Sequence, residues 1–157
     1  MDINLIDHLD ANSIVLNLKA KSKKNIISVI LDHLISAKKI KSENKKDILK
    51  VLMQREEMGS TAIGGSIALP HARLGYMKKL VICFAISHDG VDFDALDQDK
   101  VCVVVLLLSN NREAGLHLKM LAFLARMLRD RYFVQQLKNA KSVEEALIFI
   151  QKKHLVQ

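Results

Sequence analysis

The sequence of 157 residues has only two cysteines, Cys83 and Cys102, whose positions fit neither a disulfide scaffold nor a zinc site with Cys-x-x-Cys spacing. Both lie in strongly apolar segments, where a buried thiol acts as a small hydrophobic side chain. We therefore expect neither cysteine to be catalytic. A reducing cytoplasm is the simplest setting for such a chain.

Long apolar runs are also missing. The longest, Val101 to Leu108, has the length of a strand and is too short to cross a bilayer. The first residues, Met1 to Asn4, lack the basic start and apolar stretch of a signal peptide. Hydrophobic residues make up 50% of the chain and charged residues 26%, which is typical of an ordered globular protein. The length predicts a single domain over residues 1–157, without membrane insertion.

Positive charge is concentrated in one part of the chain. The formal net charge is +7, and residues 19–50 hold ten lysines against three acidic residues. Lysines along a helix can contact nucleic-acid phosphates, but aromatic residues make up only 4% of the chain. No stacking platform or recognition-helix signature is visible, so nucleic-acid binding is disfavoured. The lysines are interpreted as the solvated faces of two helices. A non-catalytic binding module that uses this 19–50 surface is an alternative.

Apolar spacing predicts an α/β protein. A short strand is expected from Ile14 to Leu18, and two buried strands from Leu80 to Ile86 and from Val101 to Leu108. Four helices are expected, after Ser22, after Ser42, from Gly115 and after Ser142. Each of the three serines can cap its helix, and Ser142 with Glu145 also fits a capping box. Helices at both ends with strands between them indicate an α/β sandwich.

Glycine and proline are scarce elsewhere but gather in residues 59–75. Four of the six glycines and the only proline, Pro70, lie there, so we expect loops around short strands. Residues 59–66 resemble a nucleotide-binding P-loop, but Gly65 stands where that motif requires lysine. The sequence thus argues against an NTPase. A loop that offers N–H groups and hydroxyls to an anion remains, and so does a flexible turn.

His71 is the strongest candidate for chemistry. It directly follows the rigid Pro70, and a neutral imidazole is a competent nucleophile near physiological pH. An isolated loop histidine is more often a plain surface residue. Here, however, the flanking side chains suit a phosphoryl group, with Ser60, Thr61 and Arg73 as a candidate phosphate-binding loop beside Arg55.

A second histidine, His117, lies one turn before Leu121 on the apolar face of the helix expected from Gly115. We expect it to be partly buried near the strand ends. On its own this pattern indicates a core histidine bonded to a carbonyl group. His71 and His117 together could hold a metal, but no His-x-His or His-Glu-x-x-His spacing is present, so phosphate is favoured over metal.

Three adjoining motifs resemble enzyme IIA of the bacterial phosphotransferase system, in the fructose/mannitol class that includes the nitrogen-regulatory form. They are Arg55-Glu56-Glu57, Gly59-Ser60-Thr61-Ala62-Ile63-Gly64 and Ile67-Ala68-Leu69-Pro70-His71-Ala72-Arg73. Phe93 to Asp97 and Leu116-His117-Leu118 follow in the family's order and spacing, so the resemblance covers almost the whole chain from Ile14 onward. One departure is Ala72-Arg73, where many relatives have Gly-Lys, and it keeps the positive charge.

The resemblance implies a mixed central β-sheet sandwiched by α-helices, and a phosphoryl carrier. The histidine that matches His71 would accept a phosphoryl group from the phosphohistidine of HPr or its nitrogen-branch counterpart. His117 and Arg55 match residues that stabilise that group. No nucleotide, metal or other cofactor is implied, because the donor is already a phosphoprotein.

The family also offers two kinds of partner. Sugar-transporting members pass the phosphoryl group to an enzyme IIB domain, whereas regulators bind target proteins according to phosphorylation state. The sequence ends soon after the part that resembles IIA, which leads us to expect the regulatory form, with a sugar-specific IIA component as the alternative.

Overall fold

The computed structural model describes residues 4–157, and its centre is a hairpin of two long strands. Strands β5 (Val81–Val91) and β6 (Val101–Ser109) pair antiparallel, with Phe84 opposite Val105. Every residue of β6 is buried. This matches the continuously apolar sequence, since a strand covered on both faces has no solvent-facing positions.

The other strands complete a mixed sheet with the order β1-β5-β6-β3-β2, in which β4 also pairs with β6. Strand β1 (Ile14–Val15) runs parallel to β5, and β2 (Ala62–Gly64) pairs antiparallel with β3 (Ile67–Ala68). Both β3 and β4 (His71–Arg73) run parallel to β6, one after the other along the same side. Pro70 lies between them because proline has no N–H to donate, while its carbonyl still accepts from the Leu107 amide.

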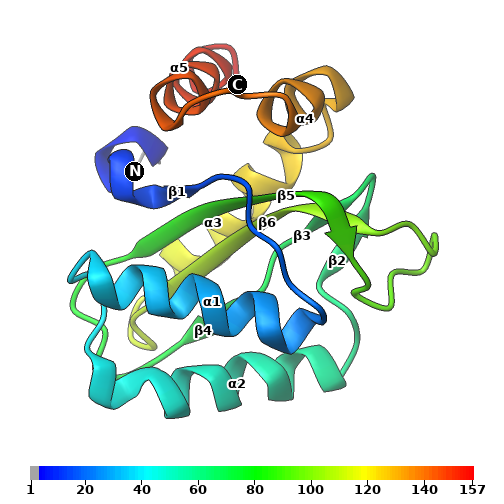
Figure 1. The fold of residues 1–157 in the computed structure, drawn as a ribbon. Helices are drawn as coiled ribbons and strands as arrows, with labels where there is room; N and C mark the ends of the chain where they lie inside the picture. The colour runs from blue at the N-terminus through cyan, green and yellow to red at the C-terminus, as the bar shows by residue number, and fades with distance from the viewer. Residues whose placement is uncertain (1–3) are drawn as a thin grey trace.

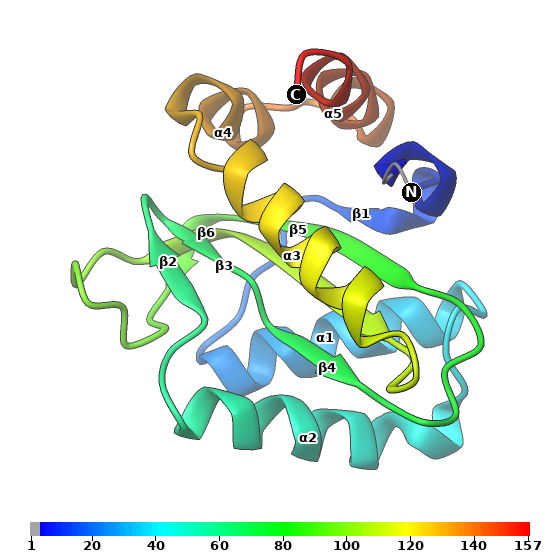
Figure 2. The same ribbon diagram turned by 180° about the vertical axis from the view of Figure 1, so that it is seen from behind.

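Helices cover both faces of this sheet (Figures 1 and 2). Helices α1 (Lys23–Ser36) and α2 (Lys45–Glu57) pack on one face, against Val104, Leu106 and Leu108 of β6. On the other face α3 (Ala114–Met127), α4 (Arg131–Lys138), α5 (Val143–Leu155) and the short 3-10 turn η1 (Leu5–His8) pack against the alternate residues of β6. The expected mixed sheet between helices is thereby confirmed.

Two of the three expected serine caps are present. The Ser22 hydroxyl accepts from the Asn25 amide, and that of Ser142 accepts from the Glu145 amide. The carboxylate of Glu145 accepts from the amide of Lys141, so the capping box forms only in part.

The expected cap at Ser42 is wrong. Residues Ser42–Asn44 form a 3-10 turn, η3, and α2 starts at Lys45. Its N-cap, Asn44, has helical dihedral angles and makes no side-chain cap bond. The start of α2 is therefore formed by the preceding 3-10 turn and not by a serine cap.

Other element boundaries differ from the expected ones. The first strand is limited to two residues, and β5 continues to Val91, five residues past Ile86. Helix α4 was not expected; it follows Asp130, whose carboxylate accepts from the amides of Tyr132 and Phe133. A further 3-10 turn, η2 (Ala11–Ser13), precedes β1. Within residues 4–157 no helix has the length and apolar character needed to span a membrane.

Candidate functional site

His71 is the first residue of β4 and is partly exposed. Pairing with Leu107 of β6 and the preceding Pro70 fix its backbone. Its Nδ1 lies 2.7 Å from the carbonyl oxygen of Leu69. A carbonyl oxygen only accepts, so Nδ1 carries the proton and Nε2 keeps its lone pair. The local fold thus leaves Nε2 as the nucleophilic nitrogen of the neutral ring.

The surroundings of His71 favour that neutral ring. Burial lowers the pKa of His71, and the positive charge of Arg55 lowers it further. The bond to Leu69 and the negative charge of Glu56 oppose part of this shift. At neutral pH the imidazole is therefore unprotonated at Nε2.

His117 lies in the first turns of α3 and is only 4% exposed. Its ring centroid is 5.5 Å from that of His71, with the planes tilted by 56°. The Nδ1 atom of His117 is 2.5 Å from the hydroxyl oxygen of Ser109, the last residue of β6. Burial, followed by repulsion from His71 in its protonated form and from the positive charge of Arg73, lowers the pKa of His117 to about 4. The site thus holds two neutral imidazoles side by side.

The end of α2 supplies both a cation and a buried anion. The Nη1 atom of Arg55 donates to the carbonyl oxygen of Gly59 over 2.7 Å, which holds the guanidinium at the helix end. Glu56, one residue on, is only 3% exposed. Its carboxylate accepts from the Thr61 amide at 3.1 Å and from the Thr61 hydroxyl, and it lies 3.5 Å from Nζ of Lys23.

These contacts fix the loop that precedes His71. Thr61 accepts through its carbonyl from the Leu69 amide, and Leu69 accepts in turn from the His71 ring. A chain of hydrogen bonds therefore runs from the buried Glu56 carboxylate through Thr61 and Leu69 to the imidazole.

The three residues of the predicted phosphate-binding loop have different surroundings. The Ser60 hydroxyl donates to the Phe93 carbonyl and accepts from the Ala62 amide, while that of Thr61 is bonded to Glu56. Arg73 is exposed at the end of β4, near enough to His117 to affect its pKa. Arg55 and Arg73 thus bring positive charge to the two histidines, whereas the two hydroxyls hold the loop in shape.

Sequence reasoning missed two residues of the site, Ser109 and Glu56. Ser109 ends a wholly apolar strand, and a polar residue at the end of a buried strand is a useful signal. Glu56 follows Leu52 by four residues on the buried face of α2, a helical spacing that places an acid where an apolar residue is normal.

Within the part of the chain that the structure describes, no group of three or more His, Cys, Asp and Glu residues is arranged to hold a metal ion. Cys83 and Cys102 are buried and unpaired with each other, and burial raises the pKa of the Cys83 thiol to about 12.

Comparison with known proteins identifies the family and the fold. The family model described as "Phosphoenolpyruvate-dependent sugar phosphotransferase system, EIIA 2" matches residues 7–153. The chain belongs to this family. The resemblance noted in the sequence is thereby confirmed, and both histidines of the candidate site lie inside the matched region of this EIIA protein.

Relatives of this EIIA protein include both regulatory and sugar-specific proteins. A nitrogen regulatory protein of Bradyrhizobium diazoefficiens is 31% identical over 140 residues, which is 89% of this chain and 90% of the relative. The fructose-specific EIIABC component of Bacillus subtilis is 30% identical over 152 residues, 97% of this chain but 24% of that longer protein.

Solved structures give the same picture. The nitrogen regulatory protein IIA-Ntr of Neisseria meningitidis superposes with a TM-score of 0.84 at 28% identity and covers 94% of this chain and 99% of its own. IIA mannitol of Escherichia coli has a TM-score of 0.75 at 25% identity, over 90% of this chain and 98% of its own. The EIIA fold of the present protein is therefore the one shared by the regulatory and the mannitol proteins.

Proposed function

We propose that this EIIA protein is a phosphoryl carrier that accepts a phosphoryl group on Nε2 of His71 from the phosphohistidine of an HPr-type protein. The hydrogen bond from Nδ1 of His71 to the Leu69 carbonyl carries the proposal, because it assigns the proton to Nδ1 and the lone pair to Nε2. Membership of the EIIA family supplies the reaction class.

The transfer balances without an added acid or base. The Nε2 lone pair forms the new P–N bond while the P–N bond of the donor breaks and its electron pair returns to the donor imidazole. The product ring carries both the phosphoryl group and the Nδ1 proton, so it becomes an imidazolium. The Leu69 carbonyl, already bonded to Nδ1, then faces that positive charge and stabilises it.

Charge on the peripheral phosphoryl oxygens needs donors fixed in advance. We assign the Ser109 hydroxyl as donor to Nδ1 of His117, 2.5 Å away, so that the neutral ring carries its proton on Nε2. That N–H is the donor for one phosphoryl oxygen, and the guanidinium groups of Arg55 and Arg73 supply positive charge for the others. In this proposal Ser60 and Thr61 act on the phosphoryl group through the backbone that their hydroxyls hold in place.

A labelling experiment tests the acceptor. The protein, incubated with phosphoenolpyruvate, enzyme I and an HPr-type protein, should gain an acid-labile phosphoryl group. His71→Ala should gain none, whereas His88→Ala, which changes an exposed histidine on β5, should be labelled like the wild type. Full labelling of His71→Ala would remove His71 as the acceptor.

We further propose that the protein acts as a regulator that binds targets according to the phosphorylation state of His71. Similarity to nitrogen regulatory proteins over most of both chains supports this role. Capture of partners with wild type, His71→Ala and His71→Asp should then give different sets of proteins. Identical sets from all three would argue against control by phosphorylation.

A sugar-specific role is the second candidate. It is supported by the fructose-specific relative and by a similar solved complex, that of enzyme IIA mannitol with phosphorylated enzyme IIB mannitol from Escherichia coli, with 25% identity and a TM-score of 0.74. A chase of the labelled protein with a purified fructose-type IIB domain distinguishes the two roles. Rapid loss of label to IIB supports the sugar-specific role, and retention of label supports the regulatory one.

A further inference from the structure

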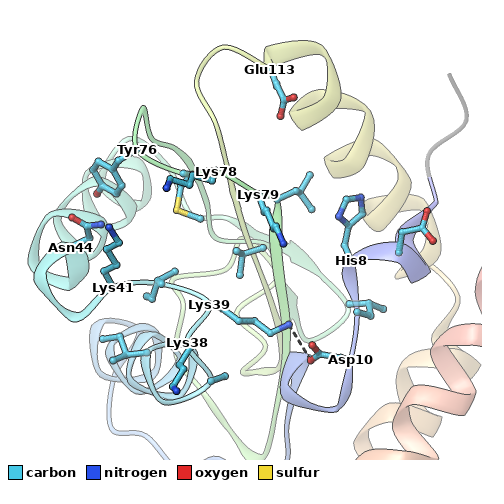
Figure 3. A pocket seen from close by; sticks show the side chains of 18 of the residues that line it. His8, Asp10, Lys38, Lys39, Lys41, Asn44, Tyr76, Lys78, Lys79 and Glu113 are labelled. Atoms are coloured by element: carbon cyan, nitrogen blue, oxygen red, sulfur yellow. Dashed lines mark ion pairs between the residues drawn. The ribbon is translucent and has the colours of Figure 1, made fainter.

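A groove of about 1220 Å³ opens at one end of the helix-sheet sandwich, apart from the two histidines (Figure 3). Its walls are the C-terminal end of α1 with the segment after it, the segment between β4 and β5, η1, and the start of α3. The floor is apolar and buried, with Ile40, Met77 and Leu80. None of the residues that line the groove belongs to the proposed phosphoryl site.

Five lysines from two separate segments line this groove: Lys38, Lys39, Lys41, Lys78 and Lys79. Figure 3 shows Lys38 and Lys39 near the end of α1, Lys41 beside Asn44, and Lys78 and Lys79 on the segment between β4 and β5. Lys78 and Lys79 lie outside the lysine-rich stretch of residues 19–50, so only the folded chain brings the two groups together. We call these five residues the lysine groove.

Most of these lysines form no ion pair with the described residues. Lys39 is paired with Asp10 at 3.0 Å. The other four are exposed and form no ion pair with any residue from 4 to 157. Asp7 and Glu113 are the remaining acidic residues of the lining, so lysines outnumber acids on the groove walls.

The end of helix α1 explains only some of the lysines in this groove. Lys38 follows the C-terminus of α1 and has a φ of +59°, in the left-handed region where glycine is preferred. Cations at a helix C-terminus interact well with its dipole, which accounts for the lysines that directly follow α1. It does not account for Lys78 and Lys79, which lie on no helix.

The lining indicates the chemistry of a ligand. Within the described lining there is no arginine, the residue that matches phosphate with two parallel bonds. Tyr76 is the one aromatic residue of the lining, and its hydroxyl already donates to Asp47 at 2.6 Å, so a base-stacking platform is absent. Lysines over an apolar floor instead suit carboxylates that alternate with apolar side chains.

We propose that the lysine groove binds an acidic segment of a partner protein. Its volume exceeds the roughly 300–1,000 Å³ usual for small-molecule pockets, and its charged groups lie on the rim over an apolar floor, as an extended peptide requires. The groove is lined by the segment between β4 and β5 and by the start of α3, so it lies next to the strand that carries His71 and on the helix that carries His117. Binding of the segment does not depend on the proposed phosphoryl transfer.

Fluorescence anisotropy with the full chain tests this assignment. The probe is a short labelled peptide rich in glutamate with leucines at intervals, at low salt. The groove variant changes Lys38, Lys41, Lys78 and Lys79 to glutamine. The matched control changes four exposed lysines outside the groove to glutamine, namely Lys19, Lys21, Lys24 and Lys152.

The two variants lose the same charge, so only position distinguishes them. Loss of one exposed ion pair weakens binding about twofold, so the groove variant, which loses four lysines, should bind the peptide about fifteenfold more weakly than wild type. The control variant should change by less than about threefold, because its lysines act only at long range. His71→Ala should bind the peptide like wild type, which separates this test from that of the phosphoryl carrier.

Three results would overturn the assignment. The first is that the wild type does not bind the peptide at low salt, and the second is that the groove and control variants lose affinity equally. The third is that the same four lysines bind a single-stranded oligonucleotide more tightly than the peptide. The last result would make the groove a nucleic-acid site.

Discussion

Replacement of Glu56 by glutamine isolates the buried carboxylate at the end of α2. Glutamine keeps the shape and one acceptor oxygen but removes the charge. The carboxylate accepts from the amide and hydroxyl of Thr61 and pairs with Lys23. Burial alone would lower the pKa of Lys23, but Asp94 and Glu56 together raise it, so the pair is coupled electrostatically.

These contacts set the size of the expected loss. A hydrogen bond to a charged group contributes about 1.5–3 kcal/mol and a neutral one about 0.5–1.5 kcal/mol, so neutralising the acceptor of the two Thr61 bonds costs about 2 kcal/mol. Loss of the longer contact to Lys23 adds up to about 1 kcal/mol, because Lys23 keeps its 2.8 Å partner Asp94. We expect the free energy of unfolding to fall by about 3 kcal/mol.

Urea unfolding followed by circular dichroism at neutral pH measures this change. The matched control is Glu57→Gln, which changes the next residue, an exposed glutamate. It should alter the free energy of unfolding by no more than about 0.5 kcal/mol. The Glu56 variant should also accept the phosphoryl group more slowly, because the hydrogen bonds that lead through Thr61 and Leu69 to His71 begin at this carboxylate.

Equal stability of the two variants would refute this account of Glu56. It would mean that the charge at position 56 is not needed to hold the loop. A large loss of stability without any change in the rate of phosphorylation would refute the second part, the connection from Glu56 to the imidazole.

Two further predictions concern His117. Ser109→Ala should slow phosphorylation about tenfold, or about 1.4 kcal/mol of transition-state stabilisation, because the His117 donor is then poorly oriented. The control is Ser87→Ala, which alters another buried strand serine. Equal rates in the two variants would contradict the role of Ser109. The contribution of His117 to the free energy of unfolding should fall by about 3 kcal/mol as the pH drops from 6.5 to 4, because its imidazole takes up a proton in this range in the unfolded chain but, with a pKa of about 4, largely not in the folded chain. His117→Gln should show a smaller slope in acid titrations of stability, and an unchanged slope would argue against a buried neutral imidazole.

Predictions from the sequence were most accurate where one physical effect dominates. Strand β6 was placed to within one residue because burial on both faces leaves a continuous apolar run. Ser22 and Ser142 were recognised as caps because each directly precedes a helical apolar pattern and its hydroxyl can accept from an amide of the first turn. Helix α4 was missed because it is short and its buried residues, Phe133, Val134 and Leu137, cover little more than one turn.

At the site, single side chains were found more easily than the contacts between them. His71 and His117 are distant in sequence but were both selected, and folding brings their rings within 5.5 Å. Glu56 belongs to the Arg55-Glu56-Glu57 motif, but the sequence does not show that the Glu56 carboxylate is buried whereas that of Glu57 is exposed. That difference arises from Lys23 and Thr61, which only the tertiary structure brings to the carboxylate.

Both histidines are tied to the same strand, β6: His71 through its pairing with Leu107, and His117 through the hydroxyl of Ser109. Backbone amides in a fully buried central strand exchange with solvent only when much of the domain unfolds, whereas helix ends and loops open far more often. Local fluctuations can therefore move the loops and the groove walls while the spacing of the two imidazoles stays unchanged. If the lysine groove binds a partner as proposed, its walls can open without displacing the two imidazoles.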